Sequence, residues 1–106
     1  MSIAITKDNY ATEIETSKQP VIIDVYASWC SPCQQMAPIF DEVAKELGSQ
    51  YKFAKLNVDE AREIAIQFGV TSVPTFIFLK DNKVVSRTIG FMDKQELMQK
   101  IRASFS

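Results

Sequence analysis

The chain has 106 residues, of which 46% are hydrophobic and 24% are charged, and these values are typical of one globular domain. Twelve Lys and Arg residues against thirteen Asp and Glu residues give a net charge of −1. This balance leaves no basic excess for binding nucleic acid or an anionic membrane. No apolar run approaches the ~20 residues of a membrane-spanning helix, and the N-terminus lacks the pattern of a signal peptide. We therefore expect residues 1–106 to form a single domain.

Strand-like and helix-like segments alternate along the chain, which predicts an α/β fold. Residues 3–5 are a short apolar segment typical of an edge strand, and residues 7–17 have the spacing of a weakly amphipathic helix. Residues 21–27 are a nearly continuous β-branched and aromatic run, as in a strand that is covered on both faces. Asp24 is the one charged residue in this run.

The next segment, residues 31–47, repeats apolar side chains at helical spacing and is followed by Gly48, a helix-stop residue. Pro32 lies just inside the helix start, where its missing N–H removes no hydrogen bond. Pro38 lies further inside and predicts a kink, because it removes one backbone hydrogen bond and crowds the preceding turn. Residues 51–58 then predict a second long strand.

The last part of the chain predicts two helices around a hairpin. Asp59 is a candidate N-cap for a short amphipathic helix. Residues 75–79 and 84–89 are strand-like and separated by a short polar segment, which predicts an antiparallel hairpin. Asp93 and Glu96 have the spacing of a capping box at the start of the final helix.

The only two cysteines, Cys30 and Cys33, lie in the sequence WCSPC. A zinc site usually needs four protein ligands, and the chain has no His and no second cysteine pair, so we expect no metal and no cofactor. A disulfide between them closes too small a loop to stabilise a fold. The absence of a disulfide framework indicates a reducing, cytoplasmic compartment, where disulfides are usually transient and catalytic. Two inert core cysteines remain an alternative.

The cysteine pair lies between the end of the strand at 21–27 and the start of the helix at 31–47. Free backbone N–H groups and the helix dipole favour negative charge at such a position. They therefore lower the pKa of a thiol and supply a nucleophile. We expect Cys30, near the cap, to have an exposed sulfur, and Cys33, one turn later, to face the protein. A Cys-x-x-Cys motif near a βαβ unit is typical of a thioredoxin-like redox site.

The chain resembles the thioredoxin family over its whole length. The matching segments are VIIDVYASWCSPCQQMAP, AKLNVDE, FGVTSVPTFIFLK and the glycine in RTIGFMDK. The resemblance implies a central mixed five-stranded sheet flanked by four helices. It also implies a monomeric redox carrier that reduces protein disulfides and is recharged by a thioredoxin reductase. Cys30 would attack the client disulfide, and Cys33 would then resolve the mixed disulfide.

Asp24 matches the family's buried aspartate, which resembles a proton acceptor for Cys33, and Lys55 matches the lysine near it. The physical argument agrees, because a carboxyl inside an apolar strand is desolvated and its pKa should rise towards neutrality. The alternatives are an aspartate that faces solvent or pairs with a lysine, and a plain surface position for Lys55.

The resemblance also implies a substrate-binding surface around a cis peptide bond between Val73 and Pro74. The backbone of Val73 would pair with an extended client peptide as an added β-strand. The other matching positions are Trp29, Ser72, Ile89, Gly90 and Phe91. We expect Gly90 to have a positive φ or a close backbone neighbour. The alternatives are an ordinary strand-start proline at Pro74 and a core aromatic ring at Trp29.

The dipeptide between the cysteines is Ser31-Pro32, where the family usually has Gly-Pro. A hydroxyl at the helix start is expected to donate to the Cys30 sulfur or to cap a backbone N–H, so both residues are candidates for redox tuning. Two other functions stay open: an oxidant or isomerase on the same fold, and a binding module without turnover. A reduction potential tests the first, and the activity of a variant without cysteines tests the second.

Overall fold

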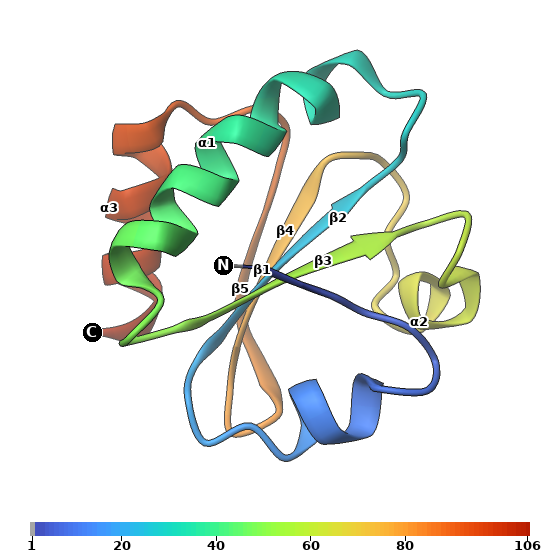
Figure 1. Ribbon diagram of the computed structural model, residues 1–106, viewed down its shortest axis with the longest axis horizontal. Coiled ribbons are helices and arrows are strands. Elements are labelled where there is room, and N and C mark those ends of the chain that lie inside the picture. The colour runs from blue at the N-terminus through green and yellow to red at the C-terminus, as the bar shows by residue number, and fades with distance from the viewer. Residues whose placement is uncertain (1) are drawn as a thin grey trace.

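A mixed five-stranded sheet forms the centre of the computed structural model, which describes residues 2–106 (Figure 1). The elements in chain order are β1 (Ser2–Ala4), η1 (Ala11–Glu15, a short π-helix), β2 (Val21–Tyr26), α1 (Ser31–Leu47), β3 (Lys52–Asn57), α2 (Arg62–Gln67), β4 (Thr75–Lys80), β5 (Lys83–Ile89) and α3 (Lys94–Phe105). Five strands and four helices confirm the predicted α/β architecture. None of the helices described within this range is long and apolar enough to cross a membrane.

The strand order in the sheet is β1-β3-β2-β4-β5. The strands β1 and β2 both lie parallel to β3, whereas β4 is antiparallel to β2 and β5 is antiparallel to β4. The predicted hairpin is therefore confirmed as β4–β5. The three parallel strands end at the same edge of the sheet, where the loop that leaves β2 carries Cys30 and the first turn of α1 carries Cys33.

Helices cover both faces of the sheet (Figure 1). On one face, α1 and α3 pack against a core rich in phenylalanine; its buried members include Ile22, Met36, Phe40, Phe53, Phe76, Phe78, Leu97 and Ile101. On the other face, η1 and α2 pack against aliphatic side chains; they include Ile14, Val21, Ile23, Val25, Ala54, Leu56, Ile64 and Ile77. Because both faces are covered, the sequence of β2 is a nearly continuous apolar run rather than an alternation of apolar and polar residues.

The position of Asp24 follows from the alternation of side chains along β2. Val21, Ile23 and Val25 belong to the aliphatic core under η1 and α2. Ile22 belongs to the core under α1, so Asp24 also lies on the face that α1 covers. This is the helix whose first turn carries Cys33.

The predicted helix at residues 7–17 is wrong in extent, because only Ala11–Glu15 form a short π-helix. Before it, the Thr6 amide donates to Asn9 Oδ1 at 2.8 Å, and Asn9 Nδ2 donates to the Ala4 carbonyl at 2.8 Å. These side-chain bonds satisfy backbone groups in a turn and compete with the start of a helix. The capping box is confirmed: Asp93 accepts from the Glu96 amide, and the Glu96 side chain accepts from the Asp93 amide.

Candidate active site

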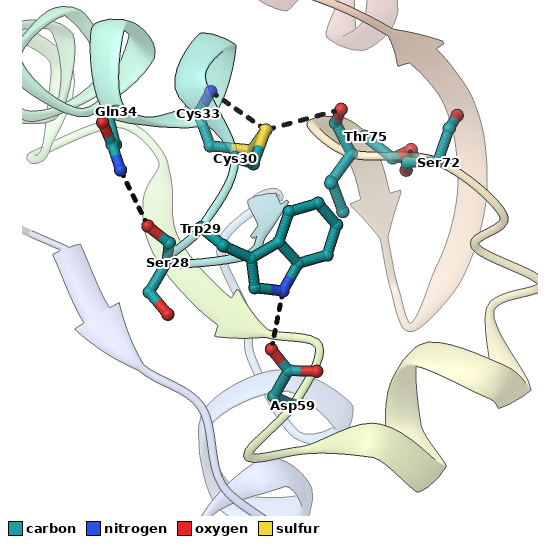
Figure 2. Close-up of a disulfide and its surroundings, with 9 residues drawn as sticks. Ser28, Trp29, Cys30, Cys33, Gln34, Asp59, Ser72 and Thr75 are labelled. Atoms are coloured by element: carbon teal, nitrogen blue, oxygen red, sulfur yellow. Dashed lines mark hydrogen bonds between the residues drawn. A yellow bond between two sulfur atoms is a disulfide. The ribbon is translucent and has the colours of Figure 1, made fainter.

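The two cysteines form a disulfide at the N-terminus of α1, with their Cα atoms 5.2 Å apart (Figure 2). Cys30 is the N-cap residue of the helix, with extended backbone angles. Its sulfur accepts a hydrogen bond from the Cys33 backbone N–H at 3.3 Å. The sulfur therefore takes the role that a side-chain oxygen plays in an ordinary N-cap, and an otherwise unpaired helix donor points at it.

The expected exposure of the Cys30 sulfur is wrong for this disulfide form. Cys30 is only 5% exposed and Cys33 is 4% exposed, so the two residues do not differ as predicted. Both pack in a small cluster with Ala27, and the Cys30 sulfur lies 3.7 Å from the Val73 carbonyl oxygen. The loop that contains Val73 covers the disulfide, and this cover is a tertiary feature that helix-terminus reasoning does not capture. The inward position of Cys33 is confirmed.

Ser31 and Pro32 are both exposed in the first turn of α1. Among the hydrogen bonds of residues 2–106, none involves the Ser31 hydroxyl, so it neither donates to the Cys30 sulfur nor caps the helix in this form. The reason is that the Cys33 amide already donates to that sulfur, and Cys30 itself occupies the cap position. Pro32 lies within the first two helical positions, as predicted.

Asp24 is buried, with 1% of its surface exposed, and this part of the prediction is confirmed. Burial raises the pKa of its carboxyl to about 7, the positive charge of Lys55 opposes this rise, and the negative charge of Asp41 adds to it. Its Oδ1 atom has no hydrogen-bond partner in the described part of the chain. A carboxyl with this pKa exchanges a proton readily near neutral pH.

Lys55 lies directly opposite Asp24 on the neighbouring strand β3 and is half-buried. Its ammonium nitrogen lies 4.8 Å from the centre of the Tyr26 ring, within the range of a cation–π contact. The ion pairs found within residues 2–106 do not include one between Lys55 and Asp24. Lys55 is therefore neither a free surface lysine nor the direct partner of the buried carboxylate.

Trp29 is 70% exposed, so the core alternative for this ring is excluded. Its indole nitrogen donates to Asp59 Oδ2 at 3.1 Å (Figure 2). The prediction of Asp59 as a helix N-cap is wrong: the N-cap of α2 is Ala61, which makes no side-chain cap bond. Asn57 forms the local turn instead, because its Oδ1 accepts from the Asp59 amide at 2.9 Å.

The loop before β4 lies against the disulfide and carries the predicted cis peptide bond between Val73 and Pro74. The Pro74 carbonyl accepts from the Gly90 amide at 2.9 Å, which ties this loop to the end of β5. Gly90 has a φ of +100°, and a Cβ built there would meet no atom within 4 Å. The glycine is therefore required by its backbone conformation and not by a close neighbour.

The remaining predicted surface residues lie around this loop. Ile89 is 62% exposed and Phe91 is 47% exposed, on either side of Gly90. A shallow groove of about 420 Å³ lies beside the Trp29 ring; it is lined by Trp29, Val58, Val70, Thr71, Ser72 and Val73. The disulfide is thus bordered by apolar side chains that remain accessible to another molecule.

Sequence reasoning missed two residues that contact the predicted ones. Tyr26 contacts Lys55, and the two-residue alternation of β2 places Tyr26 on the same face as Asp24, so a signal was present. Asp59 lies 30 residues from Trp29 in the chain, and no local pattern indicates their hydrogen bond.

Comparison with known proteins agrees with this geometry. The family model described as Thioredoxin matches residues 1–103. A thioredoxin of Mycobacterium tuberculosis is 38% identical over 100 residues, which cover 94% of this chain and 86% of the relative. A thioredoxin of Bacillus subtilis is 42% identical over 85 residues, which cover 80% of this chain and 82% of the relative. The chain therefore belongs to the thioredoxin family and is a protein-disulfide reductase.

Proposed function

We propose that this protein reduces disulfides of client proteins with Cys30 as the attacking thiol and is recharged by a thioredoxin reductase. The observation that carries the proposal is the position of Cys30: its sulfur is the N-cap of α1 and accepts the Cys33 amide. A hydrogen bond of this kind and the helix dipole both stabilise a thiolate in the reduced protein. They favour Cys30 as the attacking thiolate of the pair.

Two exchange steps move two electrons from the protein to the client. The Cys30 thiolate attacks one sulfur of the client disulfide, and the other client sulfur leaves as a thiolate. The Cys33 thiolate then attacks the Cys30 sulfur, which releases the second client sulfur and leaves the Cys30–Cys33 disulfide. A reductase that draws on NADPH returns two electrons to this disulfide, so the chain itself holds no cofactor.

Cys33 must lose its proton before the second step, and we assign Asp24 as the acceptor. Three observations support this role: the carboxyl lies on the sheet face under α1, its pKa is about 7, and its Oδ1 has no partner in the described residues. Lys55 opposes the rise of the Asp24 pKa and so helps to hold this pKa near neutral pH. Ser31 and Pro32, which lie between the two cysteines in the first turn of α1, tune the redox properties of the pair.

The client binds as an extended segment over the surface around the disulfide. The exposed Trp29 ring, the accessible loop at Ser72 and Val73, and the exposed side chains on either side of Gly90 support this arrangement. The client backbone pairs with the backbone of Val73, the residue before Pro74. Such pairing gives affinity with little dependence on the client sequence.

The protein acts as a cytoplasmic monomer in which residues 1–106 work as one unit. The outer edge of β5 supports the monomeric state, because Lys83 and Arg87 lie on this edge strand and its pairing with β4 is irregular between Phe78 and Leu79. Charges and bulges on an edge strand oppose pairing between sheets.

The primary test is reduction of insulin disulfides with NADPH and a bacterial thioredoxin reductase. Wild type should turn over, whereas Cys30→Ser, Cys33→Ser and the double Ser variant should not. Activity of the double variant in a cellular task without insulin reduction would support the alternative of a binding module. A reduction potential well above those of reducing members of the family would favour an oxidant on the same fold.

The order of the two steps is tested by trapping. Cys33→Ser should accumulate mixed disulfides with client proteins, because the first attack proceeds and the resolving thiol is missing. Cys30→Ser should trap several-fold fewer, because Cys30, and not Cys33, is the N-cap residue whose sulfur accepts a helix amide. Equal trapping by the two variants, measured by non-reducing gel electrophoresis, would contradict the assignment of Cys30.

A further inference from the structure

Three side chains on two neighbouring strands lie on the sheet face under α1. Asp24 and Lys55 are register partners on β2 and β3, and Tyr26 follows Asp24 by two residues on β2. Because side chains alternate along a strand, Tyr26 and Asp24 lie on the same face. On that face, Tyr26 is therefore the next side chain of β2 after the buried carboxyl, at the end of the strand that leads to the disulfide loop.

Lys55 contacts the ring rather than the carboxylate. Its ammonium lies 4.8 Å from the Tyr26 ring centre, and the ion pairs found in the described chain do not join it to Asp24. Asp24 is 1% exposed, so a direct ion pair would require the ammonium to lose most of its hydration. The aromatic face offers a less buried position, from which the charge of Lys55 still lowers the pKa of the carboxyl.

The place of the ammonium matters because few charges act on Asp24. Lys55 on β3 lowers the pKa of its carboxyl, Asp41 on α1 raises it, and burial raises it most. Among the charges of residues 2–106 that act on Asp24, Lys55 is the cation that opposes the effect of burial on its pKa. A lysine has a flexible four-carbon stem and a strongly hydrated head, so nothing in the side chain itself fixes it near Asp24.

We propose that Tyr26 is a positioning residue, whose aromatic ring holds the Lys55 ammonium beside Asp24 as a fixed charge. Without the ring, the ammonium moves out to solvent, where the attraction to a buried carboxylate is screened. The inference rests on the proposed function for its catalytic meaning, because Asp24 is the proton acceptor for Cys33 only under that proposal. The contact between ring and ammonium does not depend on it.

The test is a double-mutant cycle read out by the carboxyl pKa of Asp24. We would titrate the oxidised protein by carbon-13 NMR of the side-chain carboxyl in wild type, Lys55→Met, Tyr26→Leu and the double variant. Lys55→Met should raise the Asp24 pKa by about one unit in the wild-type background. In the Tyr26→Leu background the same change should raise it by less than half as much.

A matched control is Tyr26→Phe, which removes only the hydroxyl and keeps the ring. In the Tyr26→Phe background, Lys55→Met should raise the Asp24 pKa as much as it does in wild type. The reason is that the cation–π contact needs the aromatic face and not the phenol oxygen. Tyr26→Met, which keeps an apolar side chain of similar length, replaces Tyr26→Leu if the latter does not fold. An effect of Lys55→Met that is equal or larger without the ring would overturn the inference.

The measurement separates this inference from the proposed function, because it uses the oxidised protein and no turnover. A reduced coupling in Tyr26→Leu supports the positioning role even if Asp24→Asn reduces insulin at the wild-type rate, a result that would remove only the catalytic role of Asp24. An unchanged coupling together with normal insulin reduction overturns the role of Tyr26 and leaves the function intact.

Discussion

At the scale of single residues, the exposed Trp29 ring is held by a carboxylate from a distant loop. The indole N–H donates to Asp59 Oδ2 at 3.1 Å, although 70% of the ring surface is exposed. An exposed aromatic side chain with no such bond samples several rotamers, and a client must then order it on binding. The hydrogen bond orders the ring in advance, next to the disulfide.

Asp59→Ala should therefore weaken client binding without unfolding the protein. We expect KM for insulin to rise about two- to twelvefold, since ordering one side chain costs about 0.5–1.5 kcal/mol. The fluorescence anisotropy of Trp29 should fall in this variant. The signal comes from one residue, because the chain has one tryptophan. Asp59→Asn keeps an acceptor oxygen and should resemble wild type, and Glu60→Ala removes a neighbouring charge. The ordering account fails if Asp59→Ala behaves like Glu60→Ala.

At the scale of elements, the loop of the β4–β5 hairpin consists of two residues whose backbone lies in the left-handed region. Asp81 has a φ of 52° and Asn82 a φ of 61°. A two-residue loop with positive φ at both positions matches the twist of the flanking strands and favours Asn and Gly. Other L residues are strained there, because Cβ approaches the following carbonyl.

Substitutions at Asn82 should shift stability in opposite directions. Asn82→Gly should raise the free energy of unfolding by about 0.5 kcal/mol, and Asn82→Ala should lower it by about 1 kcal/mol. Urea denaturation measures both, and insulin reduction should not change, since the turn lies at the far end of β4 from the Val73-Pro74 loop. A destabilised Asn82→Gly protein would contradict this account of the turn.

Elements with repeated or reciprocal signals were predictable from the sequence, and elements with one local signal were not. The helix at Ser31–Leu47 shows several turns of periodicity, and the capping box at Asp93 depends on two residues that bond each other. Residues 7–17 had only weak periodicity, and hydrogen bonds around Asn9 replaced the first turns. A single Asp before a helix is weaker still, and Asp59 bonds Trp29 instead.

At the scale of the whole molecule, composition and strand pattern predicted the layered α/β fold, and the resemblance to a family predicted the candidate site. The burial of Asp24 followed from the apolar run around it. The cover over Cys30 and the contact of Lys55 with Tyr26 did not follow, because each depends on how a separate loop or strand packs in three dimensions. Periodicity predicts which face a side chain occupies but not what it touches there.

The buried carboxyl also makes a prediction about the stability of the whole protein. The pKa of Asp24 is about 7 in the folded state, above the ~3.9 of an unfolded chain. Between these values the folded state binds more protons at this carboxyl than the unfolded state, so the contribution of Asp24 to stability is greatest below about pH 4 and is lost as pH rises through 7. The chain also has no histidine, which is the only side chain whose ordinary pKa lies between pH 5 and 8.

Asp24→Asn should remove this loss of stability, because its amide stays neutral at every pH. Between pH 5 and 8, oxidised wild type should lose roughly 2–3 kcal/mol of unfolding free energy that the variant keeps, at about 1.4 kcal/mol per pKa unit. Urea denaturation at several pH values measures the difference. Asp8→Asn, at an exposed aspartate, is the control and should follow wild type. Parallel curves for wild type and Asp24→Asn would show that the folded protein does not hold a carboxyl with a raised pKa at this position.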